Sequence, residues 1–148
     1  KKNMSKFFRP DMVLNGTWGN VWIDSDYMAQ ATALQAKFKL TKTDVTQTGT
    51  LAKGQKITGI EGTGTLKLNK TSSYFISRLL SDIKQGKSPV ITIISDIDDP
   101  TVSGNERVKL TGVTFDELTL ADWEAGKLSE ESYPFTFEDA ELIDAIPD

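Results

Sequence analysis

The sequence predicts a mainly β protein, an antiparallel β-sandwich or barrel with one flanking α-helix. Apolar and polar residues alternate with a period of two through most of the chain, which is typical of half-buried strands. Only residues 71–87 show the period of 3.6 that indicates an amphipathic helix. No apolar run approaches the roughly 20 residues that a membrane-spanning helix needs, so we expect no membrane anchoring.

The chain of 148 residues has the usual length of one domain, and 38% of its residues are hydrophobic. Residues 1–14 are mostly polar, with Phe7 and Phe8 among their few apolar anchors, and we expect them to form a flexible N-terminal arm. This arm is basic but lacks the apolar stretch of a secretory signal. We expect residues 15–148 to form a single β domain.

The clearest strand covers residues 33–42, because apolar and polar residues alternate there without a break. One face is expected to be wet and basic, with Lys37, Lys39 and Lys42. The other face is expected to lie in the core and carries Leu34, Ala36, Phe38 and Leu40. Residues 43–54 are polar and contain two glycines, which predicts a long hairpin loop. A loop of that length is usually functional or disordered, so we expect an assembly loop or a mobile tip.

Another strand is expected at residues 56–69, and it contains Gly59, Gly62 and Gly64 in the order G-x-x-G-x-G. A phosphate-binding loop would add a Lys-Ser/Thr pair and the start of a helix, and the sequence has neither there. Glycines inside a strand more often mark a bulge or a close approach of two backbones. We therefore expect these glycines to have a structural role.

The helix expected at residues 71–87 has a single apolar stripe. The stripe consists of Phe75, Ile76, Leu79, Leu80 and Ile83. Ser72 or Ser73 can cap its first amides, Lys84 suits the negative end of the helix dipole, and Gly86 is placed to end the helix. In a chain of strands, one such helix is expected to cover an open sheet face or a barrel end, and so to close the core rather than form a site.

The remaining strands follow the helix. They are expected at residues 88–96, 106–115 and 133–137. The phase of alternation slips near Thr111 and Gly112, which predicts a β-bulge. Pro134 indicates an edge strand or a strand start, because proline cannot donate a backbone hydrogen bond. The residues after 137 are expected to form an acidic tail.

The chain has no Cys and no His, which excludes disulfides, thiol nucleophiles, Cys/His zinc sites and histidine acid–base catalysis. Paired carboxylates remain possible, but acidic residues are so common here that a pair carries no information. Asp24 and Asp26, and the acidic residues 96–99, could contribute metal ligands, yet plain surface turns are expected. We expect no enzyme, no catalytic residue, no metal site and no cofactor.

Charge is distributed unevenly along the sequence. The net charge is −4, but residues 1–95 carry 14 Lys and Arg against 6 Asp and Glu, whereas residues 96–148 carry 3 against 15. The two parts therefore have net charges of +8 and −12. Surfaces of opposite sign on one molecule can dock head to tail on copies of that molecule.

Seven segments, in order and spacing, resemble the XkdM-like family of phage tail tube proteins, which occur in contractile tails and PBSX-like defective prophages. The first four are GTWGNVWID (16–24), ALQAKFKLTK (33–42), ITGIEGTGTLKL (57–68) and the helix with its exit IKQGKSP. The others are ITIIS (91–95), NERVKLTGVTFDELTLADWE (105–124) and YPFTFEDAEL (133–142). Together they cover about residues 15–146, and the first 14 residues fall outside the resemblance.

The resemblance implies a structural subunit of the tail tube of a phage or phage-like particle. It implies six copies in a ring, with rings stacked into a hollow tube that conducts DNA inside a contractile sheath. The implied partners are other copies of the chain, the tail sheath protein, the tape-measure protein and a baseplate initiator. The implied location is the virion tail, assembled in the cytoplasm of the host bacterium.

A lumen that passes DNA is expected to be acidic or neutral, so a basic strand face would be a departure. Residues 43–54 and the N-terminal arm are expected to contact the adjacent ring. Two alternatives remain open from the sequence. One is a type VI secretion-like tube protein, which would also form rings, and the other is a monomeric small β-barrel that binds a ligand in an internal pocket.

Overall fold

The computed structural model describes residues 9–147 of the chain. These residues contain one α-helix, eight strands and two short 3-10 helices. The helical elements are η2 (Pro10–Met12), η3 (Gly16–Trp18) and α1 (Tyr74–Lys84). The strands are β1 (Gly19–Ile23), β2 (Asp26–Tyr27), β3 (Ala31–Val45), β4 (Gly54–Asn69), β5 (Ile91–Ile97), β6 (Glu106–Phe115), β7 (Glu130–Phe137) and β8 (Asp139–Asp144).

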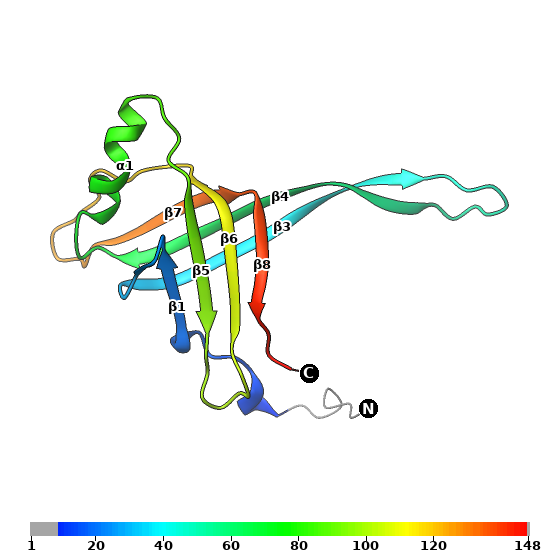
Figure 1. Cartoon of the computed structure of the whole chain (residues 1–148), viewed down its shortest axis with the longest axis horizontal. Helices are drawn as coiled ribbons and strands as arrows, with labels where there is room; N and C mark the ends of the chain where they lie inside the picture. Colours follow the sequence, from blue (N-terminus) through cyan, green and yellow to red (C-terminus); the bar gives the residue numbers. More distant parts are fainter. Residues whose placement is uncertain (1–8, 148) are drawn as a thin grey trace.

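The strands form one antiparallel sheet in the order β2-β1-β5-β6-β7-β4-β3, and β8 also pairs with β6. Figure 1 shows that this sheet folds over into two layers, one of β1, β5, β6 and β8 and one of β7, β4 and β3. The strands of the two layers cross steeply, as in orthogonal sheet packing. The mainly β, antiparallel class with one flanking helix is therefore confirmed.

Strand β6 belongs to both layers. Its first half pairs with β8, and its last residues, Thr114 and Phe115, pair with β7. Gly112 lies between these two stretches with φ +65°, and the register between β5 and β6 shifts there. The bulge predicted near Thr111 and Gly112 is thus confirmed, and it bends β6 from one layer into the other.

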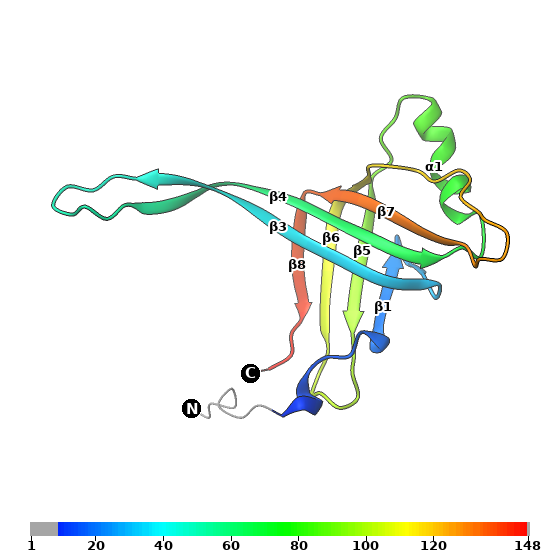
Figure 2. The same ribbon diagram turned by 180° about the vertical axis from the view of Figure 1, so that it is seen from behind.

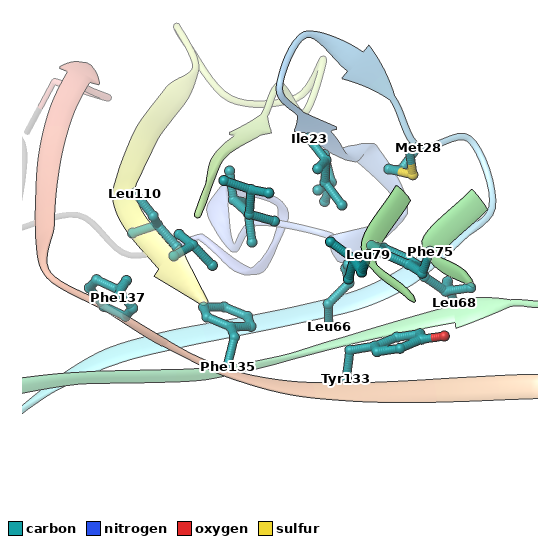
Figure 3. Close-up of a cluster of buried hydrophobic side chains, with 14 residues drawn as sticks. Ile23, Met28, Leu66, Leu68, Phe75, Leu79, Leu110, Tyr133, Phe135 and Phe137 are labelled. Carbon is teal, nitrogen blue, oxygen red and sulfur yellow. The ribbon is translucent and has the colours of Figure 1, made fainter. Parts of the chain in front are cut away.

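The hydrophobic core lies between the two layers and is shown in Figure 3. Its fully enclosed side chains come from both layers and are Ile23, Leu66, Ile93, Val113, Tyr133 and Phe135. The carboxylate of Glu131 is buried beside them. The Tyr133 hydroxyl donates to its Oε1 at 2.8 Å. Lys70 Nζ lies 3.2 Å from Glu131 Oε2, so both oxygens of this carboxylate have a partner.

Helix α1 closes one end of the core, as its apolar stripe predicts. Phe75 and Leu79 are buried, and the ring of Phe75 lies 4.5 Å from that of Tyr133 between centroids. Ser73 occupies the N-cap position, but its side chain makes no capping hydrogen bond. Gly86 follows the helix with φ +77°, a conformation that suits glycine, so its predicted role in ending the helix is confirmed.

Strands β3 and β4 form a hairpin that is much longer than the rest of the sheet. β7 accompanies β4 only as far as the pair Gly62–Phe137, so beyond it β4 has β3 alone as a partner. Residues 39–61, named the distal hairpin from here on, therefore project from the body as a two-stranded ribbon, which Figure 2 shows. The loop predicted at residues 43–54 is too long, because both strands continue into it and only residues 46–53 form the tip.

The core face predicted for residues 33–42 is wrong beyond its first residue. Leu34 packs against the core, but Phe38 is 37% exposed and Leu40 is 46% exposed. Phe38 still contacts the ring of Phe137, at 5.2 Å between centroids, whereas Leu40 lies on the ribbon that continues past the edge of the other layer. The predicted basic face is also partly wrong. Side chains alternate along β3, so Lys42, which pairs with Ile57, lies on the face opposite to Lys37 and Lys39.

Two C-terminal predictions also need correction. The predicted acidic tail contains strand β8, which pairs with β6 and packs Ala140 against the core. Strand β7 lies between β6 and β4, although its pairing with β6 covers only Phe135 and Thr136. Pro134 lies just beyond the last of these pairs, with Thr65 of β4 on one side, and on the other side the Asp116 amide donates to its carbonyl at 2.9 Å.

The predicted N-terminal arm falls only partly within the described residues. Residues 1–8, with Phe7 and Phe8, lie outside them. Residues 10–12 form η2, and the Thr101 hydroxyl oxygen lies 2.9 Å from the backbone carbonyl oxygen of Asp11. No helix in the described part of the chain has the length and apolar character to cross a membrane.

Candidate assembly surfaces

The two acidic turns that could have held a metal serve as structural ties. Asp24 lies in the turn between β1 and β2 with φ +47°, and its Oδ1 accepts from the Thr92 amide at 2.8 Å. Its other oxygen forms an ion pair with Arg78 of α1. The Tyr74 hydroxyl donates to Asp26 at 2.8 Å, and burial first, then this bond, raises the pKa of Tyr74 to about 12. Together these contacts fasten the helix to the β1–β2 turn.

The turn after β5 uses its carboxylates in the same structural way. Asp99 is almost fully buried and accepts from the amide and hydroxyl of Thr101 at 2.9 and 2.8 Å. The Asn15 amide donates to it at 2.9 Å. These donors, those of Thr101 above all, lower the pKa of Asp99. Within residues 9–147 no three acidic side chains gather as metal ligands.

The glycines of β4 show the close backbone approach that their positions predict. A Cβ on Gly64 would lie 2.3 Å from the Gln35 carbonyl oxygen and 2.5 Å from the Phe135 ring. A Cβ on Gly62 would lie 2.6 Å from the Phe137 carbonyl oxygen. Gly59 has no such crowding but lies next to the register shift opposite Thr41. At Gly62 and Gly64, β4 pairs with β3 on one side and with β7 on the other. The backbone there is part of the sheet ladders and does not form an anion-binding loop.

The distal hairpin is a surface that the monomer does not complete. Leu40, Ile57 and Ile60 are 46%, 51% and 57% exposed along it. β3 is also the last strand of the sheet, so its outer edge lacks a partner strand in the described residues. A long edge strand with apolar side chains is a template for pairing with another chain. Along this hairpin, the sequence predicted an assembly contact only for residues 43–54, because alternation looks the same whether a face meets its own core or another molecule.

A second candidate surface lies at the helical end of the molecule. Residues 116–129, which connect β6 and β7, are named the acidic loop because they contain four Asp or Glu and one Lys. Trp123 is 80% exposed there and Leu128 is 98% exposed. Between this loop and α1 lies a cleft of about 450 Å³, named the helix cleft. Its apolar lining is Leu79, Leu80, Ile83, Pro89, Phe115, Leu118 and Leu120.

The outer face of the β7–β4–β3 layer is polar. It is the face opposite the buried Leu66 and Phe135, and cross-strand pairs place Lys37 beside Thr63, and Thr63 beside Thr136. Lys39 lies opposite Glu61 on the same face. The layer therefore has one apolar side against the core and one broad hydroxyl-rich, mildly basic side toward solvent.

Known proteins resemble this chain in both sequence and fold. The sequence profile of the family described as phage tail tube protein matches residues 6–144. The Bacillus subtilis (strain 168) phage-like element PBSX protein XkdM is 32% identical over 137 residues, which are 91% of this chain and 93% of XkdM. The fold resembles that of a chain in the structure of the anti-feeding prophage tube-terminating cap (TM-score 0.70, 10% identity), and the match covers 96% of this chain and 98% of that one.

A second structural likeness is to a chain in the extended sheath–tube complex of an extracellular contractile injection system. The TM-score is 0.68 at 8% identity, and the match covers 99% of this chain and 100% of the other. At such low identity these two structures show a shared fold. The profile match and the XkdM relationship extend over nearly the whole chain and establish the family: this chain belongs to the phage tail tube proteins.

Proposed function

We propose that this tail tube subunit works without catalysis, as a building block of rings of six copies that stack into the hollow tube of a phage or phage-like particle. The observation that supports this most strongly is the distal hairpin. It extends roughly 25 Å past its last contact with β7, given about 3.3 Å per residue for eight residues of β4. It carries apolar side chains on a long edge strand.

The energetics favour a second copy as the cover for this ribbon. A two-stranded hairpin alone is marginally stable in water at best. Leu40, Ile57 and Ile60 are each about half exposed, so covering them would contribute about 1 kcal/mol per side chain. Because every copy has the same hairpin, a contact between the hairpin and a different surface of the next copy repeats around a rotation and can close into a ring.

The polar outer face of the β7–β4–β3 layer supports a proposal for the lumen. A sheet that continues from copy to copy through the β3 edge would turn one whole face inward. The face of Thr63, Thr65 and Thr136 has no apolar core function, so we assign it to the lumen that conducts DNA. Lys37 and Lys39 would make this lining mildly basic rather than acidic, unless acidic side chains of a neighbouring copy pair with them.

The remaining partners follow from the family. A tail sheath protein around the tube, a tape-measure protein within it and a baseplate initiator beneath it are part of the proposal, as is assembly in the host cytoplasm. The named structural relatives belong to a sheath–tube complex and a tube cap, which supports a multi-subunit tail context. Residues 1–14 and the tip of the distal hairpin, residues 46–53, are proposed to contact the adjacent ring, while the paired strands of the hairpin contact the neighbour within the ring.

Negative-stain electron microscopy and analytical ultracentrifugation over a concentration series test this proposal. The wild-type chain should give six-fold rings or hollow tubes as concentration rises. Ile60→Asp should keep the monomer fold and prevent assembly, whereas Ile143→Asp, at a 45% exposed isoleucine of β8, is the matched control. A monomer at every concentration, with or without a preformed tube end as a seed, would support the monomeric ligand-binding alternative instead.

A further inference from the structure

We infer that the tip of the distal hairpin seats Leu51 in the helix cleft of a second copy of this chain. This inference rests on the proposed self-assembly and goes beyond it by naming the two surfaces that meet. Three features support it. A fully exposed leucine lies at one end of the molecule, an apolar cleft lies at the other end, and the charges around the two are opposite.

Leu51 lies in the tip of the distal hairpin and makes no contact that hides it. Its exposed fraction is 101%, which is the value of a leucine in an extended peptide. Beside it, Gly49 turns the backbone with φ +82°, and the Ala52 amide donates to the Thr50 hydroxyl at 3.2 Å. An apolar side chain held at the end of a long ribbon suits insertion into a partner.

The helix cleft is a matching receptor. Its volume of about 450 Å³ lies in the range of pockets that bind small apolar groups. Leu79 and Leu80 of α1 form one wall, and Leu118 and Leu120 of the acidic loop form another. Ile83 at its rim is 44% exposed and Leu120 is 60% exposed, so the monomer leaves this apolar lining in contact with water.

Charge favours the same pairing. Residues 42–58, around the tip, carry three Lys and one Asp, a net charge of +2. The acidic loop carries a net charge of −3, although Lys87 also lines the helix cleft. Opposite potentials of this kind speed the encounter and fix the orientation of two protein surfaces.

The position of the two surfaces decides the kind of assembly. Figures 1 and 2 both place the hairpin tip at one end of the long axis, and α1 with the acidic loop at the other end. A contact between them cannot form within one chain, and it leaves each copy with one free tip and one free cleft. Such a heterologous contact repeats in one direction only, which gives the assembly a polarity.

Disulfide trapping provides the direct test, because the chain contains no Cys and each introduced thiol is unique. Leu51→Cys and Leu120→Cys are purified separately, mixed under assembly conditions and oxidised. A covalent dimer should form in the mixture and far less in either variant alone, since a disulfide requires Cα atoms within about 7 Å. Leu128→Cys, on the same loop but absent from the cleft lining, replaces Leu120→Cys as the control.

A second variant separates this contact from the fold. Leu51→Asp should leave the monomer's thermal unfolding unchanged, because Leu51 is fully exposed. It should raise the concentration needed for half-maximal assembly by about tenfold or more, as expected for the loss of one buried leucine. Thr48→Asp, which adds the same charge to the same tip, is the matched control and should have a smaller effect.

The possible results separate the proposed self-assembly from the proposed contact of Leu51 with the helix cleft. If the wild type forms neither rings nor tubes, the proposed function fails and this inference fails with it. If tubes form but the Leu51–Leu120 pair gives no more dimer than the Leu51–Leu128 pair, self-assembly stands and the inference is overturned. Normal tube formation by Leu51→Asp would likewise overturn it and would leave the helix cleft to a different protein.

Discussion

Replacing Gly64 by alanine should destabilise the monomer, whereas the same change at Gly59, five residues away on the same strand, should not. At Gly64 the new methyl group would lie 2.3 Å from the Gln35 carbonyl oxygen and 2.5 Å from the Phe135 ring. β4 is paired on both sides at this point, so it cannot move aside without breaking a ladder. At Gly59 the nearest atom, Thr41 Cβ, is 3.7 Å away, which is an ordinary contact.

These distances set the expected magnitudes. Overpacking of this kind costs about 1–3 kcal/mol of unfolding free energy. A tolerated glycine-to-alanine change instead stabilises by about 0.4–1 kcal/mol, because it restricts the unfolded chain. The two variants should therefore differ by roughly 1.5–4 kcal/mol. At about 2–4 °C per kcal/mol for a chain of this size, their Tm values should differ by roughly 3–16 °C.

Circular dichroism melts at dilutions where light scattering shows a monomer would measure the difference without a contribution from assembly. Urea unfolding at 25 °C gives an independent value, and equal m-values for the two variants would show that both unfold over the same surface. Equal Tm values, or a more stable Gly64→Ala variant, would refute the argument that Gly64 is required by close backbone approach.

Two further predictions concern pH. The pKa of Asp99 is lowered in the folded chain, so its stabilisation is present above its unfolded pKa of about 3.9 and is lost as pH falls through the folded value. Asp99→Asn should therefore be less stable than wild type near neutral pH, and urea titrations from pH 5 to pH 2 should show that gap closing; a gap independent of pH would contradict the assignment. The pKa of Tyr74 is raised to about 12, so the unfolded chain releases this proton first, and stability should fall as pH rises from about 10 to 12. Tyr74→Phe should make that fall shallower without removing it, because burial also raises the pKa of Tyr133; identical alkaline profiles for variant and wild type would argue against it.

The elements that could be predicted from the sequence are those whose pattern is set by contacts within the chain. The helix, the bulge at Gly112 and the close approach at Gly62 and Gly64 all follow from local rules of spacing and backbone geometry. The family could be recognised because several weak segments occur in a fixed order. The amphipathic stripe of α1 identified its core side in part, since Phe75 and Leu79 are buried whereas Ile83 is 44% exposed.

The rest depends on what lies opposite each face, which a single chain does not encode in its periodicity. Leu40 and Leu66 occur in similar alternating patterns, yet one is 46% exposed and the other is fully buried. Strand β8 was missed because its acidic composition resembles a solvated tail, and only pairing with β6 makes it a strand. The helix cleft joins residues about 40 positions apart, and no spacing rule brings them together.

The ribbon also has a consequence for the kinetics of growth. With no third strand beside it, the distal hairpin is the part of the monomer most easily frayed, and ordering it costs conformational entropy when it docks. Two free subunits must both meet that cost for a single new interface, which makes nucleation slow. A completed ring offers several ordered docking surfaces at once, so an arriving subunit gains more contacts for the same loss. Filaments should therefore elongate from existing ends far faster than they start, and the number of filaments would be set by the supply of starting rings.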